Sequence, residues 1–132
     1  MPTTDDLELT AVFPVPPAVI YHAWLSGERH TDMTGGVASS APEVGGAFTA
    51  WDDYIHGIHL ELAPPHRIVQ GWRTSDFEDG QPDSRLEILF DAEGGGTRVT
   101  LRHTHIPAGD GPRYAQGWQE FYFQPMAEFF AG

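Results

Sequence analysis

Alternating apolar and polar side chains predict a strand near the start of the chain. Apolar residues occupy every second position from Leu7 to Phe13, and Glu8 and Thr10 lie between them. A period of two turns one set of side chains toward a core and the other toward solvent. Pro14 and the prolines that follow it end this strand.

A short amphipathic helix is predicted directly after this strand. Pro17 suits the first turn of a helix, because its missing N–H would have no partner there. Ile20 and Trp24 then recur at helical spacing, and the pair at residues 26–27 ends the segment. Residues 28–33 add a further helical turn before two glycines, so short helices follow the first strand.

The middle of the chain alternates between strand-like segments and turn signals. The expected strands span residues 46–51, 54–62, 67–74, 84–91 and 97–105. Apolar and polar residues alternate well in the last two, which is typical of an antiparallel sheet with one face on a core. The glycine-rich stretch at 93–96 lacks the Lys-Ser/Thr pair of a phosphate-binding loop, so it predicts a hairpin turn and not a nucleotide site.

A long aromatic helix is predicted at the end of the chain. Its broad apolar face consists of Tyr114, Trp118, Phe121, Tyr122 and Phe129. Pro125 lies inside this helix and should kink it or remove one hydrogen bond. These elements predict an α+β fold in which a curved antiparallel sheet wraps round the helix, with residues 1–132 as a single domain.

The net charge of the chain argues against anionic partners. Nineteen acidic residues against seven basic ones give a formal net charge of −12, which repels polyphosphate and anionic lipid headgroups. We therefore expect no nucleic acid partner and no membrane association. The acidic N-terminus is unlike a signal peptide, and no apolar run approaches the length of a membrane span, so a cytoplasmic protein is expected.

Missing residue types exclude several chemistries. The chain has no cysteine, which rules out disulfides, iron–sulfur clusters and thiol nucleophiles. It has no lysine either, so Schiff-base catalysis is excluded. Ser84 lacks the glycines of a nucleophile elbow and is expected to begin a strand. No cofactor is expected.

Two segments in the middle of the chain resemble a known family. They are residues 45–57, GGAFTAWDDYIHG, and residues 60–73, LELAPPHRIVQGWR. Residues 96–103 and the pair at 117–118 extend the match. The chain resembles the activator of heat-shock protein 90 ATPase homologue family, an AHSA-like branch of the START/SRPBCC superfamily. The resemblance implies a helix-grip fold, in which a sheet of about seven strands holds a long C-terminal helix above a hydrophobic cavity.

Strand parity predicts which side chains enter that cavity. His103 and His105 share the parity of apolar residues and should point inward, as should His56, whereas His59 should point outward. Aromatic side chains can supply a wall for a flat ligand. The predicted ligand-binding residues are Trp51, Tyr54, His56, Trp72, His103, His105, Trp118 and Tyr122.

The inward histidines admit three interpretations. Three imidazoles could coordinate zinc, but no carboxylate accompanies them, and no metal site is expected. In an enzyme, His103 is the first choice for proton transfer, with His56 or Tyr54 as its partner. In the third interpretation the histidines bond to backbone or to each other and line a pocket.

The resemblance implies three functions. The first is binding of a small hydrophobic or aromatic molecule in the cavity. The second is an enzyme of the polyketide cyclase/dehydratase type that uses histidine acid/base chemistry in the same cavity. The third is a module that stimulates a chaperone ATPase, although a strongly acidic surface offers no evident docking patch. A second copy of the chain is a further candidate partner.

Overall fold

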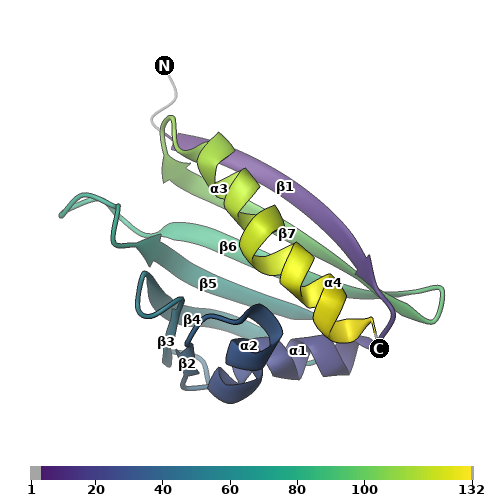
Figure 1. Cartoon of the computed structure of the whole chain (residues 1–132). Coiled ribbons are helices and arrows are strands. Elements are labelled where there is room, and N and C mark those ends of the chain that lie inside the picture. The colour runs from purple at the N-terminus through teal and green to yellow at the C-terminus, as the bar shows by residue number, and fades with distance from the viewer. Residues whose placement is uncertain (1–3, 132) are drawn as a thin grey trace.

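The fold is an antiparallel sheet crossed on one face by the C-terminal helix (Figure 1). A computed structural model of the chain describes residues 4–131. The strands are β1 (Thr4–Phe13), β2 (Ser39–Ser40), β3 (Ala47–Ala50), β4 (Ile55–Ala63), β5 (Arg67–Thr74), β6 (Ser84–Glu93) and β7 (Gly96–Pro107). They form a seven-stranded sheet in the order β1-β7-β6-β5-β4-β3-β2. The α+β class and the helix-grip architecture predicted from the sequence are confirmed.

Two short helices carry the chain from one edge of the sheet to the other. They are α1 (Pro17–Leu25) and α2 (Gly27–Thr34), and they connect edge strand β1 to edge strand β2. The Ser26 side chain accepts a hydrogen bond from the backbone N–H of Arg29, which caps the start of α2. Both helices were predicted, whereas β2 was not.

The C-terminal helix contains an irregular turn at its centre. It consists of α3 (Gly111–Trp118), a π-helical turn η1 (Gln119–Phe123) and α4 (Gln124–Phe130). The N–H of Gln124 donates to the carbonyl of Gln119, five residues back. Pro125 follows at once, and a wider turn gives its ring the room that a regular helix lacks. The predicted irregularity is therefore a π turn that precedes the proline.

The core fills the space between this helix and the inner face of the sheet. Side chains at alternate positions of β6 and β7 face it as predicted, and Leu86, Ile88, Phe90, Val99 and Leu101 are completely buried. Phe121 and Phe129 belong to the predicted apolar stripe of the helix, yet both are about half exposed. Phe129 follows the π turn, which shifts the phase of the helix and moves this residue off the predicted stripe.

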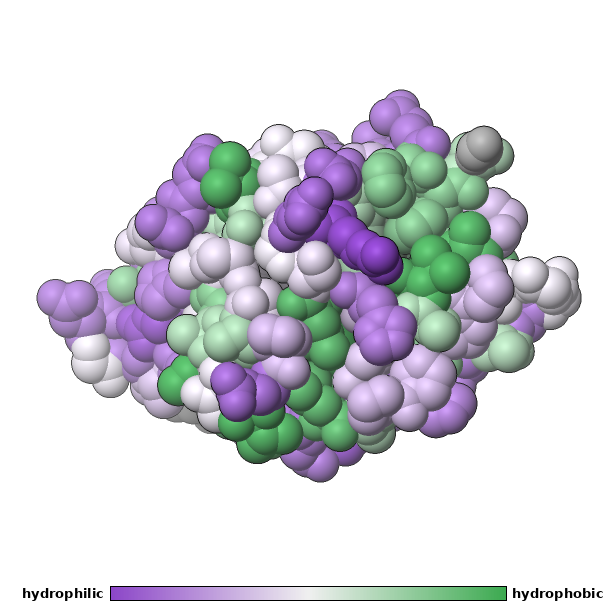
Figure 2. Space-filling view, turned by 90° about the horizontal axis from the view of Figure 1, so that it is seen from below, coloured by the Kyte–Doolittle hydropathy of each residue, from purple (hydrophilic) through white to green (hydrophobic). Residues whose placement is uncertain are grey.

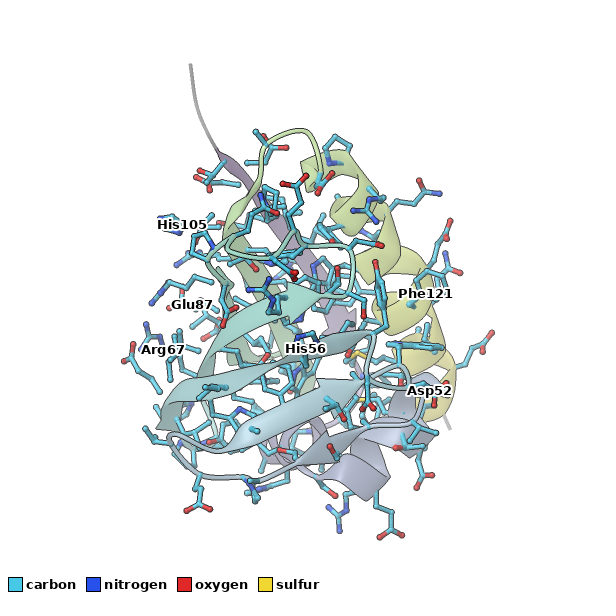
Figure 3. All side chains as sticks on the ribbon, turned by 90° about the vertical axis from the view of Figure 1, so that its left-hand side faces the viewer. Asp52, His56, Arg67, Glu87, His105 and Phe121 are labelled. Carbon is cyan, nitrogen blue, oxygen red and sulfur yellow. The ribbon has the colours of Figure 1, made fainter. Side chains whose placement is uncertain are left out.

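The outer face of the sheet carries a row of alternating charges. Arg102 pairs with Glu8 and Glu87, and Arg67 pairs with Glu87 and Glu61. Figure 3 shows Arg67 and Glu87 together on the side of the sheet away from the helix. The pairs with Glu8 and Glu61 are largely exposed and contribute little to stability, whereas Glu87 is largely buried between its two arginines.

Candidate functional site

A cavity of about 380 Å³ lies between the first half of the C-terminal helix and strands β4 and β5. It is lined by Trp51, Tyr54, Ile55, Trp72, Arg113, Tyr114, Gly117, Trp118, Phe121 and Tyr122. Tyr54 and Phe121 are partly exposed and mark its mouth. The rings of Phe121 and Trp51 meet there edge to face, with centroids 5.4 Å apart.

The structure brings together the aromatic residues predicted to bind a ligand. Trp51, Tyr54, Trp72, Trp118 and Tyr122 all line the cavity. The predicted histidines His56, His103 and His105 do not. The predicted ligand-binding residues did not include five residues of the lining, which are Ile55, Arg113, Tyr114, Gly117 and Phe121.

Three polar atoms of the cavity wall have protein partners, whereas the buried Nε1 of Trp51 has no partner among the described residues. The Tyr122 hydroxyl bonds to Nε2 of His30 at 2.7 Å, and Nε1 of Trp118 donates to Nδ1 of His103 at 3.2 Å. The Tyr114 hydroxyl bonds to the Thr74 hydroxyl at 2.7 Å. Because these polar atoms already have protein partners, the wall presents mainly aromatic surface to a ligand.

His103 is fully buried behind this wall. Trp118 can only donate, so Nδ1 of His103 accepts, and the ring proton is on Nε2, which lies 2.8 Å from the Ser84 hydroxyl. Ser84 in turn donates to the carbonyl of Trp72 at 2.6 Å. Burial lowers the pKa of His103 to about 3.

This bonding pattern bears on the proton-transfer role predicted for His103. The imidazole donates to Ser84, which is the reverse of the direction in which a general base activates a serine. Both ring nitrogens are occupied, and the ring does not line the cavity. Proton transfer would require one of these two bonds to break. Ser84 begins β6, as predicted.

His30 is a second buried histidine behind the wall, and sequence analysis did not single it out. Its Nδ1 lies 2.9 Å from the carbonyl of Trp24, to which it donates, so its Nε2 accepts the Tyr122 hydroxyl proton. Burial lowers the pKa of His30 to about 4 and raises the pKa of Tyr122 above its ordinary value.

The predicted inward orientation of His56 is wrong. His59 is buried and stacks on Phe48, whereas Ile58 and Leu60, which have the same parity as His56, are 45% and 47% exposed. The pairing of β4 with β5 shifts register between His59 and Glu61. This irregularity changes the phase of the strand, so the parity of Leu62 does not extend back to His56.

The predicted inward orientation of His105 is also wrong. Two residues, Thr104 and His105, fall opposite Asp6 where the β1–β7 register shifts, and His105 has a φ of 60°. This bulge turns His105 outward and Ile106 inward, where Ile106 is completely buried. Figure 3 shows His105 on the side of the sheet away from the helix. Within residues 4–131, no group of three His, Cys, Asp or Glu side chains could hold a metal ion.

A polar cluster lies at the rim of the cavity. Asp76 accepts hydrogen bonds from the Tyr54 hydroxyl at 2.6 Å and from Arg113 at 2.8 Å, and these bonds lower the pKa of Asp76. Partial burial and the bond to Asp76 raise the pKa of Tyr54 to about 12. The Arg113 guanidinium also approaches Asp110, at 3.5 Å, and lies 4.7 Å from the centre of the Tyr114 ring.

An unusual turn places Trp51 at the mouth. Trp51, Asp52 and Asp53 all adopt left-handed backbone conformations, with φ values of 51°, 57° and 71°. Such conformations cost free energy in residues other than glycine and are common at functional sites. The Trp51 ring also requires Gly36 beneath it, because a Cβ at that position would lie 2.4 Å from the ring.

A second hollow, of about 560 Å³, is less suited to a hydrophobic ligand. It lies against α1 and is lined by Tyr21, His22, Leu25, Ser26, Arg29, Pro42, Leu62 and Pro64. Figure 2 shows the end of the molecule that carries α1 and α2, where hydrophilic and apolar groups are interspersed. Within residues 4–131, no helix has the length and apolar character needed to cross a membrane.

Comparisons with known proteins agree with this architecture. Human activator of 90 kDa heat shock protein ATPase homolog 1 is 27% identical over 127 residues, which cover 96% of this chain and 37% of the human protein. This chain therefore spans about a third of the length of that relative. The crystal structure of an HSP90 activator from Plasmodium falciparum has 27% identity and a TM-score of 0.83, covering 90% of this chain and 91% of that one.

A third comparison concerns the fold alone. The Aha1 dimer from Colwellia psychrerythraea has a TM-score of 0.79 at 12% identity, with 96% of each chain covered. Its dimeric state belongs to that protein, and self-association of this chain stays a prediction. The family model for Activator of Hsp90 ATPase homolog 1-like proteins matches residues 14–131. With nearly its whole length matched, the chain belongs to this AHSA1-like family.

Proposed function

We propose that this domain binds a small hydrophobic or aromatic molecule in the cavity beneath the C-terminal helix. The observation that carries the proposal is the orientation of the wall, in which Tyr114, Trp118 and Tyr122 use their polar atoms on protein partners. A wall held in this way is preorganised and apolar, as small-molecule sites usually are.

Size and rim chemistry support the same proposal. A volume of about 380 Å³ falls within the range of known ligand sites. The rim offers Tyr54, Asp76 and Arg113 as polar groups that can meet one end of a ligand. A molecule with one or two fused rings and a polar substituent fits this pattern.

Gly117 provides a sharp test of cavity binding. A Cβ added at this position meets only an atom of Phe121, at 3.9 Å, so a larger side chain would grow into open space. Gly117→Leu should fill part of the cavity and leave the fold intact, since leucine is a better helix former than glycine. Gly117→Ala is the matched control, because it makes the same backbone change with little added volume.

The experiment starts with native mass spectrometry of the purified protein, followed by titration of phenols, flavonoids and fatty acids against tryptophan emission. We expect Gly117→Leu to weaken binding by at least about tenfold and Gly117→Ala to retain most of it. Ligand at 100 times its Kd should add about 2.7 kcal/mol of stability to the parent. Equal binding by the parent and Gly117→Leu would contradict the proposal.

Stimulation of a chaperone ATPase is a second candidate function. It is favoured by the names of the relatives, an activator of the 90 kDa heat shock protein ATPase and an HSP90 activator. The purified domain, added to an HSP90-type chaperone from the same organism, should raise its ATP turnover. An unchanged rate together with no complex at micromolar protein would remove this candidate and leave cavity binding unaffected.

A further inference from the structure

The cavity is lined mainly by aromatic rings. Trp51, Tyr54, Trp72, Tyr114, Trp118, Phe121 and Tyr122 account for most of the lining, and the others are Ile55, Gly117 and Arg113. The face of an aromatic ring carries partial negative charge and attracts cations, most strongly in tryptophan. This attraction is stronger at a buried ring than at an exposed one, and four of these rings are buried: Trp72, Tyr114, Trp118 and Tyr122.

The positive charge of Arg113 is already matched by carboxylates. One of its terminal nitrogens donates to Asp76 at 2.8 Å, and the other lies 3.5 Å from Asp110. Its guanidinium also lies over the Tyr114 ring. An anionic ligand that approached Arg113 would have to displace these two carboxylates or share the guanidinium with them.

Further carboxylates follow Trp51 in the turn at the mouth. Asp52 and Asp53 are both exposed, and Figure 3 shows Asp52 on the same side of the molecule as Phe121. Together with Asp76 and Asp110 they outnumber the guanidinium of Arg113, in a chain whose net charge is −12. The field at the mouth therefore favours positively charged molecules and disfavours negatively charged ones.

We propose that the ligands preferred by this cavity are organic cations, flat aromatic molecules whose positive charge lies against the rings near the mouth. The inference rests on the proposed function, since it names the ligand class of the same cavity. Two features of the cavity contribute to the affinity for such a ligand. The apolar wall acts on any flat molecule of suitable size, whereas the ring faces and the mouth carboxylates act only on charge.

Three molecules of nearly equal shape separate these contributions. N-methylquinolinium is a cation, methylnaphthalene is its uncharged counterpart, and naphthoate carries a negative charge. Each is titrated against the purified protein by isothermal calorimetry, with tryptophan emission as a second readout. We expect the cation to bind about 3- to 30-fold more tightly than methylnaphthalene, and naphthoate to bind most weakly.

A variant of the mouth isolates the role of its carboxylates. Asp52→Asn with Asp53→Asn removes two charges, and asparagine tolerates the left-handed conformation that both positions adopt. The double variant should bind N-methylquinolinium about 3-fold more weakly at low ionic strength and methylnaphthalene unchanged. Added salt should reduce the difference between parent and variant. The Gly117→Leu variant should lose both ligands.

The possible failures are distinguishable. Binding of methylnaphthalene or naphthoate as tight as that of the cation would overturn the charge preference and leave cavity binding intact. An unchanged affinity for the cation in the double variant would overturn the role of Asp52 and Asp53. Failure of all three molecules to bind, with no response of the parent to any other flat compound, would overturn the proposed function as well.

Discussion

The two halves of the interface between helix and sheet are filled in different ways. Beneath α4 and the last residue of η1, the space is closed by apolar side chains. The centroid of the Phe13 ring lies 6.1 Å from those of both Phe123 and Phe130, and Met126 is completely buried. Beneath α3 and η1, a cavity of about 380 Å³ remains. We call these the closed half and the open half.

The difference lies in what keeps the side chains in place. In the closed half, close packing alone holds the rings, as in any protein core. In the open half, packing is incomplete, and hydrogen bonds from Trp118 and Tyr122 to two buried histidines add to the ring contacts that remain. Directional bonds fix the orientation of these two rings beside the empty space.

Acid should weaken the open half most strongly. The folded protein holds the pKa of His30 at about 4 and that of His103 at about 3, below the value of about 6.5 in the unfolded chain. Below pH 6.5 the unfolded chain therefore binds more protons than the folded one. The free energy of unfolding is unaffected by these histidines above pH 6.5 and decreases as the pH falls below it. One pH unit corresponds to about 1.4 kcal/mol, so each of these histidines should lower the free energy of unfolding by roughly 3 kcal/mol between pH 6.5 and pH 4.

Urea denaturation at pH 8, 6 and 4 would measure this loss. His30→Gln should reduce the slope of the free energy of unfolding against pH by about 1 kcal/mol per pH unit between pH 6 and 4, because one buried histidine that resists protonation is gone. A slope that is the same in parent and variant would show that His30 does not resist protonation in the fold.

Replacing a ring by alanine should lower the free energy of unfolding strongly in the closed half and only slightly at the mouth of the open half. Phe13 is 1% exposed, so Phe13→Ala should lower the free energy of unfolding by about 3–5 kcal/mol. Phe121 is 51% exposed, and Phe121→Ala should lower it by less than about 1 kcal/mol. Similar losses in the two variants, measured by urea denaturation, would remove the distinction between the halves.

Loss of one wall hydrogen bond should have an intermediate effect. Trp118→Phe keeps an aromatic ring but leaves Nδ1 of the buried His103 without its donor. An unpaired buried acceptor costs about 1–3 kcal/mol. Thermal and urea denaturation of Trp118→Phe would measure the cost. Tyr122→Phe, which removes the donor to His30, is the parallel variant, and neutral results for both would show that packing alone holds the wall.

The smallest expected effect is a gain in stability. Gly117 lies within α3, where alanine is preferred to glycine by about 0.5–1 kcal/mol. Because the new methyl group points into open space, Gly117→Ala should raise Tm by a few degrees, as differential scanning calorimetry would record. A lower Tm would indicate that the cavity at this point is narrower than the structure shows.

Much of the fold could be predicted because one face of the sheet is buried along most of its strands. In β6 and β7, the alternation from Leu86 and Val99 onward identified both the strands and the core face. Strand β2 was missed because two residues are too few to show a period. Pro125 signalled an irregular helix, but the kind of irregularity depends on packing that a local pattern does not contain.

The candidate site was predicted less completely because its geometry depends on irregular positions. Parity arguments failed for His56 and His105, since a register shift or bulge reverses the phase of a strand and leaves no clear mark in the sequence. His30 was missed because its partner Tyr122 lies 92 positions away. Two rings of the aromatic wall, Trp118 and Tyr122, could be predicted because they are four residues apart and therefore share one face of a helix.

The π turn between α3 and α4 has a consequence for how this domain can vary. A π turn is equivalent to one residue inserted into a regular helix. Removing one residue from η1 would restore regular geometry and rotate α4 by about 100° relative to α3. Phe130 and Met126 would then leave the closed half, while α3 would still face the cavity. The inserted residue therefore lets α3 face the cavity while α4 packs in the closed half. Substitutions on one of these helices need not be matched by substitutions on the other.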